Sequence, residues 1–259
     1  MAFIDITIAS EYLNMYTPVA IIIPDEKLDA EVPEGYKYPV VYCLHGYKDN
    51  YLSWMKKSML EQVAREYRCA VVTPNCPNSF YTDGKNGFDY YDYVTKELPV
   101  KLSRLLPIST KREDTFIMGV SMGGYGAFML AMNNPDKYRA AYAFSGPLGL
   151  DYENGVIFGI NETMSRQVMG AFGTQEEFHD SRYYLYNAVN KLNEYEGNKP
   201  RMKAICGLQD PLCLTYSNKF VEYVRNNTSL SLEYETADGK HDFFFWNKYL
   251  DDAFHFFGF

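Results

Sequence analysis

The chain has 259 residues, of which 47% are hydrophobic and 22% charged, and its formal net charge is −8. This composition excludes wholesale disorder and allows one domain with a large core. An acidic chain without a block of lysine or arginine argues against a nucleic-acid partner, and no apolar run approaches the roughly 18 residues of a membrane span.

The first part of the chain alternates strand-like and helical segments. Continuous apolar runs are typical of strands that are covered on both faces, whereas a 3.6-residue period indicates helices. We expect strands at residues 3–10, 15–23, 38–44, 69–73, 114–120 and 138–144. Helices are expected at 53–67, at 90–106 with a kink at Pro99, and at 122–132.

The alternation pauses after the strand that ends near Phe144. Residues 148–198 form a longer, irregular segment, with helices expected near 162–171 and 181–194. Because this segment lacks a strand set, we interpret it as a lid-like helical insertion in a single domain that spans residues 1–259.

The remainder of the chain returns to the earlier pattern. We expect strands at 201–206 and 230–236, and helices at 214–225 and 242–257. Strands that alternate with helices predict an α/β fold with a mostly parallel central sheet and helices on both faces.

The sharpest chemical signal is Gly119-Val120-Ser121-Met122-Gly123, which follows a predicted buried strand and opens a helix. In such a nucleophile elbow the tight turn exposes the serine hydroxyl. Glycine is needed on both sides because a Cβ there would collide with the neighbouring strand or helix. An ordinary glycine-rich turn is the alternative, but the place between strand and helix indicates that Ser121 is a nucleophile.

A serine hydroxyl needs a base that accepts its proton, and in a fold of this kind the order along the chain is serine, acid, histidine. The chain has only four histidines. His45 precedes the serine and is excluded as base by this order. His179 is expected on a solvated helix edge and His255 within an aromatic helix. His241, in a loop after the last predicted strand, is therefore the candidate base.

The candidate acid is Asp210, in the loop that follows the predicted strand 201–206. A buried carboxylate at this place would fix the imidazole tautomer and stabilise the imidazolium that forms during attack. Asp238 and Asp242 are rivals by proximity. Both lie within three residues of His241, too close in sequence to reach its far nitrogen without strain.

The oxyanion of a tetrahedral intermediate needs two preorganised N–H donors. The backbone N–H of Met122, directly after the nucleophile, is one candidate. The other is the N–H of Tyr47, in the loop that follows the predicted strand 38–44 and contains His45-Gly46. A plain strand-end turn is the alternative for this loop.

With these motifs in order, the chain resembles the α/β-hydrolase esterases of the tributyrin esterase type, which are related to feruloyl and acetylxylan esterases, esterase D and S-formylglutathione hydrolases. The matching segments are 44–54, 80–83, 93–99, 115–127, 145–146, 207–211 and 239–246. The resemblance implies Ser121, Asp210 and His241 as a catalytic triad, with an oxyanion hole from Tyr47 and Met122. Tyr47 departs from the small residues that relatives often carry there, and we expect it to narrow or shape the acyl site.

The resemblance implies a serine carboxylic ester hydrolase that works through an acyl-enzyme. Short-chain acyl, acetylated-sugar and hydroxycinnamoyl (feruloyl-type) esters are the expected substrates. Alternatives are a thioesterase of the S-formylglutathione hydrolase type, an acyltransferase, and a non-catalytic binding protein on the same fold. Four aromatic residues near the motifs are candidate substrate contacts, with ordinary packing as the alternative for each: Trp54, Phe80, Tyr81 and Trp246.

We expect no metal and no cofactor, because the sequence has no cluster with metal-ligand spacing and no nucleotide-binding motif. Five cysteines without a C-x-x-C pair predict free thiols in a reducing compartment.

The first ten residues lack the positive charge of a signal peptide, so we expect a cytoplasmic protein, with a mature secreted form as the alternative. The aromatic segment 254–259 is either core or a surface for a homo-oligomer.

Overall fold

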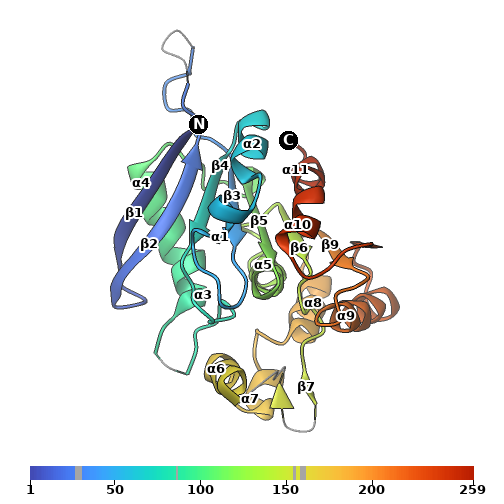
Figure 1. Ribbon diagram of the computed structural model, residues 1–259. Helices are drawn as coiled ribbons and strands as arrows, with labels where there is room; N and C mark the ends of the chain where they lie inside the picture. The colour runs from blue at the N-terminus through green and yellow to red at the C-terminus, as the bar shows by residue number, and fades with distance from the viewer. Residues whose placement is uncertain (27–30, 86, 154–155, 158–161) are drawn as a thin grey trace.

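The protein is described by a computed structural model that covers residues 1–26, 31–85, 87–153, 156–157 and 162–259. Its centre is an eight-stranded sheet in the order β1-β2-β4-β3-β5-β6-β9-β10 (Figure 1). The strands are β1 (Ala2–Ser10), β2 (Met15–Ile23), β3 (Val40–Leu44), β4 (Ala70–Pro74), β5 (Thr115–Val120), β6 (Ala140–Phe144), β9 (Arg201–Gly207) and β10 (Leu232–Ala237). All pairs from β4 to β10 are parallel, and β2 runs antiparallel to both of its neighbours. The predicted, mostly parallel sheet is confirmed.

Helices cover both faces of the sheet (Figure 1). One face packs against α3 (Tyr90–Asp92), the π-helical turn η1 (Tyr93–Glu97), α4 (Leu98–Leu105), α5 (Met122–Asn133), α8 (Leu185–Glu194) and α9 (Leu214–Asn227). The other face packs against α1 (Ser53–Lys57), α2 (Leu60–Glu66), α10 (Phe243–Lys248) and α11 (Leu250–Phe257). Successive residues of a strand serve opposite faces: Ile117 lies in the first core and Met118 in the second.

Two of the helices that the periodicity predicts are divided, and a third contains a π-helical turn. The segment predicted at 53–67 breaks at Ser58, whose backbone is extended and whose hydroxyl donates to the Trp54 carbonyl at 2.5 Å. The segment predicted at 90–106 contains the π-helical turn directly before α4, which has Pro99 in its first turn, where a proline N–H is not needed. The terminal helix divides at Tyr249 into α10 and α11.

The segment 148–198 contains elements of two kinds. Helix α8 packs against α5 and belongs to the layer that covers the sheet. The rest comprises the short strands β7 (Tyr152–Glu153) and β8 (Val156–Ile157) and the helices α6 (Glu162–Phe172) and α7 (Gln175–His179). Figure 1 shows α6 and α7 beyond one end of the sheet, away from both termini. The lid-like role of this segment stays a prediction.

The bounds of helix α7 are not predicted from the sequence, although His179 is expected on a helix edge, and a signal for the start of this helix exists. The Thr174 side chain accepts from the Glu177 N–H, and the Glu177 carboxylate accepts from the Thr174 N–H. This reciprocal capping box is readable as a threonine followed three residues later by glutamate.

The C-terminal aromatic residues are core. Phe254 and Phe257 are fully buried, and the Phe257 ring stacks on Phe116 of β5 with centroids 5.0 Å apart. The alternative that this segment forms a surface for another chain is therefore not favoured. None of the described helices is both long and apolar enough to cross a lipid bilayer.

Candidate active site

Ser121 occupies the turn between β5 and α5 with φ of 56° and ψ of −119°, a conformation that side-chain-bearing residues rarely adopt. The flanking glycines explain how this turn packs. A Cβ on Gly119 would lie 2.2 Å from the Gly123 carbonyl oxygen, and a Cβ on Gly123 would lie 2.2 Å from the carbonyl oxygen of Leu44. The structure thus confirms the steric reason for both glycines.

The loop after β3 lies against the serine. A Cβ on Gly46 would lie 3.4 Å from the Ser121 Cβ, an ordinary contact distance. Among the described residues, no backbone hydrogen bond uses the N–H of Tyr47 or of Met122. Met122 is the first residue of α5, where helical N–H groups lack partners within the helix. Both donors proposed for the oxyanion therefore lie beside Ser121 without a backbone partner.

His45 holds this loop in place. Its Nε2 accepts from the Cys76 N–H at 3.0 Å, so its Nδ1 carries the proton and donates to the Gly46 carbonyl at 2.9 Å. Burial lowers the pKa of His45, in agreement with a neutral ring that is engaged at both nitrogens. His45 therefore supports the loop that contains Tyr47. Both of its ring nitrogens are engaged, so neither is free to accept a proton from Ser121.

Two aromatic side chains hold the backbone carbonyls of the residues that precede Gly46. The Trp54 indole N–H donates to the Leu44 carbonyl at 3.0 Å, and the Tyr81 hydroxyl donates to the His45 carbonyl at 2.8 Å. Both side chains are almost completely buried. They therefore act beneath the loop, where the end of β3 needs hydrogen-bond donors.

The Tyr47 side chain joins the loop to helix α6. Its hydroxyl donates to Gln167 Oε1, which also accepts from Asn78 Nδ2 at 3.2 Å. Asn78 Oδ1 in turn accepts from the N–H of Lys48 at 2.8 Å. Tyr47 and the next residue, Lys48, are thus both connected to Gln167, Tyr47 directly and Lys48 through Asn78.

Asp210 and His241 form a close pair. Asp210 Oδ2 lies 2.7 Å from His241 Nδ1, and Oδ1 accepts from the N–H groups of Leu212 and Cys213 at 3.1 and 3.0 Å. Burial alone would raise the pKa of Asp210, but the hydrogen bonds from His241, Cys213 and Ser145 outweigh it and lower that pKa below its usual value. Asp210 is fully buried and ionised beside the imidazole.

The two rival carboxylates have other partners. Asp238 accepts from Gln209 Nε2 at 3.3 Å, and Asp242 Oδ1 caps α10 by accepting from the Phe245 N–H at 3.0 Å. Within the part of the chain that the structure describes, neither carboxylate forms a hydrogen bond with His241.

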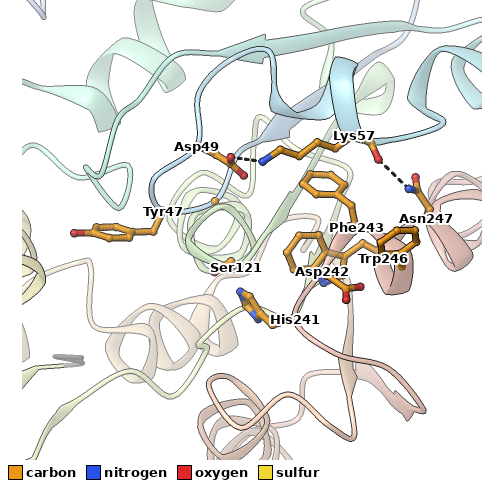
Figure 2. Close-up of a pocket in the computed structure, with 11 residues that line it drawn as sticks. Tyr47, Asp49, Lys57, Ser121, His241, Asp242, Phe243, Trp246 and Asn247 are labelled. Atoms are coloured by element: carbon orange, nitrogen blue, oxygen red, sulfur yellow. Dashed lines mark hydrogen bonds and ion pairs between the residues drawn. The ribbon is translucent and has the colours of Figure 1, made fainter. Parts of the chain in front are cut away.

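Ser121 and His241 open onto the same cavity, of about 570 Å³. Figure 2 shows the imidazole turned toward Ser121. The cavity is lined by Gly46, Tyr47, Asp49, Lys57, Ser121, His241, Asp242, Phe243, Phe244, Trp246 and Asn247. Its wall is mainly apolar, with the aromatic side chains of Tyr47, Phe243, Phe244 and Trp246. Its cation, Lys57, is paired with Asp49 at 2.5 Å. Such a site suits an uncharged or weakly polar group next to the serine.

Of the four aromatic residues expected to contact substrate, Trp246 lines this cavity. Trp54, Phe80 and Tyr81 do not, and this part of the sequence-based expectation is corrected. Trp54 and Tyr81 are used as buried donors, and Phe80 packs against Phe172 with ring centroids 5.1 Å apart.

Several lining residues were not expected from the sequence. Phe243 and Asn247 lie on α10, directly after the histidine loop, and Lys57 lies at the end of α1. The position of Phe243 two residues after His241 is the one signal that would have found it.

Asp210, Cys213 and His241 bring three potential metal-ligand atoms within 4.8 Å of one another, a grouping that spacing along the chain does not reveal. Two of these residues are already paired with each other. Burial raises the pKa of the Cys213 thiol well above its usual value, and a thiol binds metal as the thiolate. The donor set therefore fits an Asp–His pair better than a metal ion.

Comparison with known proteins identifies the family. A family model named Esterase, described as "Putative esterase", matches residues 10–257. The chain belongs to this esterase family. It is 30% identical to an acetyl esterase of Caldicellulosiruptor saccharolyticus over 98% of this chain and 97% of that protein. A 29% match to the S-formylglutathione hydrolase of Bos taurus covers 62% of this chain and 60% of that protein.

The fold of this esterase also matches solved structures. FphF, a fluorophosphonate-binding serine hydrolase of Staphylococcus aureus, superposes with a TM-score of 0.84 at 24% identity and covers 99% of this chain and 98% of its own. The predicted α/β-hydrolase fold is confirmed, and the chain is an esterase.

Proposed function

We propose that the esterase acts through Ser121, His241 and Asp210. Ser121 Oγ attacks the ester carbonyl carbon while His241 Nε2, the ring nitrogen not facing Asp210, accepts the hydroxyl proton. The carbonyl π electrons move to the oxygen, which accepts hydrogen bonds from the N–H groups of Tyr47 and Met122. The C–O bond to the alcohol then breaks, and the leaving oxygen takes the proton from Nε2.

The resulting acyl-enzyme is released by water. His241 accepts one water proton while the water oxygen attacks the acyl carbon. The second tetrahedral intermediate collapses, Ser121 Oγ recovers the proton, and a carboxylic acid leaves. Asp210 stays ionised throughout and stabilises the imidazolium in both steps.

The observation that carries this proposal is the Asp210–His241 pair at 2.7 Å, opening onto the cavity that contains the strained Ser121. Hydrolysis of p-nitrophenyl acetate tests it. Ser121→Ala should lower kcat by about 10⁴-fold or more, because the nucleophile is removed. Ser231→Ala, at an exposed serine before β10, is the matched control and should keep wild-type activity. Wild-type activity in Ser121→Ala would refute the assignment.

We further propose that the substrates are esters of short acyl groups, with acetyl first. The full-length similarity to an acetyl esterase supports this choice, as does the aromatic cavity whose cation is neutralised by Asp49. The partial match to S-formylglutathione hydrolase supports a thioester as the second candidate. A panel of acetylated xylose, methyl ferulate and S-formylglutathione separates these by kcat/KM. The acetyl ester should give the highest value, and a higher value for the thioester would reverse the order.

We infer a reducing, cytoplasmic location and a small-molecule or carbohydrate-linked ester as partner. Five free and fully buried cysteines support the location. Cell fractionation checks it, and light scattering measures whether copies of the chain associate.

A further inference from the structure

Ser145 is a second strained serine near the site. It directly follows β6, is fully buried, and has φ of 47°. Its N–H donates to the Ile205 carbonyl of the neighbouring strand β9 at 2.8 Å, which holds the backbone in this conformation. Glycine adopts such a φ freely, so a side chain retained there calls for an explanation.

The Ser145 hydroxyl lies between two groups of the candidate site. Its Oγ accepts from the Trp246 indole N–H at 3.1 Å. The Ser145 hydroxyl is also among the groups that lower the pKa of the Asp210 carboxyl group. Because the hydroxyl has one proton and the indole already donates to its oxygen, the proton is available to the carboxylate.

Trp246 also contacts His241, the partner of Asp210. Its ring meets the His241 imidazole edge-on, with centroids 5.2 Å apart and an interplanar angle of 84°. Trp246 therefore contacts His241 directly and Ser145 through a hydrogen bond, and Ser145 acts on the Asp210 carboxyl group. The four side chains come from the loops after β6 and β9, the loop before α10, and α10 itself.

We propose that Ser145 and Trp246 are positioning residues that hold Asp210 and His241 in the geometry needed for proton transfer. This inference rests on the proposed function of the triad. Asp210 Oδ1 is held by two backbone N–H groups, and Ser145 supplies a side-chain donor that resists rotation of the carboxylate away from Nδ1. Trp246 orients the hydroxyl by donating to it and limits tilting of the imidazole by ring contact.

Substitution of Ser145 by alanine and by glycine separates the hydroxyl from the backbone strain. Ser145→Ala removes the hydroxyl and keeps the strain, whereas Ser145→Gly removes the hydroxyl and relieves it. Both should lower kcat on p-nitrophenyl acetate about tenfold or more, with KM within about twofold, because a hydrogen bond to a charged group is lost during the chemical step. The glycine variant should melt at or above the temperature of the alanine variant.

Trp246→Phe tests the second member of the pair. It keeps an aromatic ring beside His241 but removes the indole donor. The kcat of the double variant Ser145→Ala/Trp246→Phe should be little lower than that of Ser145→Ala, because both changes interrupt one chain of contacts. If the loss of kcat in the double variant equals the product of the losses in the two single variants, the two residues act independently and the proposed coupling is wrong.

Wild-type kcat in Ser145→Gly would overturn the positioning role, since it would show that only the backbone matters. Ser121→Ala is measured in parallel. If Ser121→Ala is inactive while Ser145→Gly is fully active, the triad stands and only this inference fails. If Ser121→Ala is active, the proposed function itself fails.

Discussion

At the scale of single residues, the site combines strained serines with a fully buried carboxylate. Ser121 and Ser145 both have positive φ, and each follows the end of a parallel strand. Such conformations persist only where the surrounding structure enforces them, here through hydrogen bonds to the Phe144 and Ile205 carbonyls. The strain places one hydroxyl toward the cavity and the other toward Asp210.

Asp210→Asn tests the acid. The amide cannot stabilise an imidazolium as a carboxylate does, so kcat should fall by about 10² to 10⁴-fold. Steady-state hydrolysis of p-nitrophenyl acetate measures this loss. Asp238→Asn is the matched control, because Asp238 is close to His241 in sequence but bonds to Gln209. A comparable loss in the control would transfer the role of acid to Asp238.

The sequence was sufficient to nominate Ser121, Asp210 and His241, because each residue type is scarce or sits in a motif at a strand end. It was insufficient for the aromatic residues. Trp54 and Trp246 both lie in matching motifs, yet one donates beneath the loop and the other lines the cavity. Both indoles lie in the same helical layer, so only the side-chain packing within that layer decides which way each one points.

At the scale of elements, α5 packs tightly against the end of β3. Gly123→Ala would place a Cβ 2.2 Å from the Leu44 carbonyl oxygen, a backbone atom that cannot swing aside. We expect the free energy of unfolding to fall by about 1–3 kcal/mol. Urea denaturation measures this change.

The control for this substitution is Gly197→Ala. A Cβ there meets the side chain of Tyr195, which is partly exposed and free to rotate away. Its effect should stay within about 0.5 kcal/mol. Equal losses in both variants would mean that the contact with β3 is not the cause.

The order of strands and helices was predictable because buried strands and amphipathic helices have different periods. The breaks within helices were harder to predict from the sequence. Ser58 ends α1 through its own hydroxyl, and Met59 donates its N–H to Asn247 Oδ1 at 3.0 Å, a contact between segments far apart along the chain. Periodicity reports the buried face of a helix but not a long-range partner that interrupts it.

At the scale of the whole molecule, stability should depend on pH through groups in the site. The pKa of His45 is lowered in the folded state, so the unfolded chain binds a proton more readily. The stability that neutral His45 provides is therefore present above its ordinary pKa of about 6.5 and is lost as pH falls below that value. Asp210, whose folded pKa is also lowered, adds a further loss at more acidic pH.

Urea denaturation at pH 7 and pH 5 measures this dependence. His45→Gln lacks the titrating ring, so its stability should fall less between the two pH values than that of the wild-type protein. His241→Gln serves as the control for a histidine on the cavity wall. An equal fall in the wild-type protein and His45→Gln would contradict the role of His45.

The contact between Tyr47 and Gln167 joins helix α6 of the insertion to the loop that follows β3. A substitution of Gln167 on α6 would therefore act on Tyr47, the residue proposed to donate to the oxyanion. In this chain, a change on α6 that removes Gln167 would have to replace the anchor of Tyr47 to keep that side chain in place.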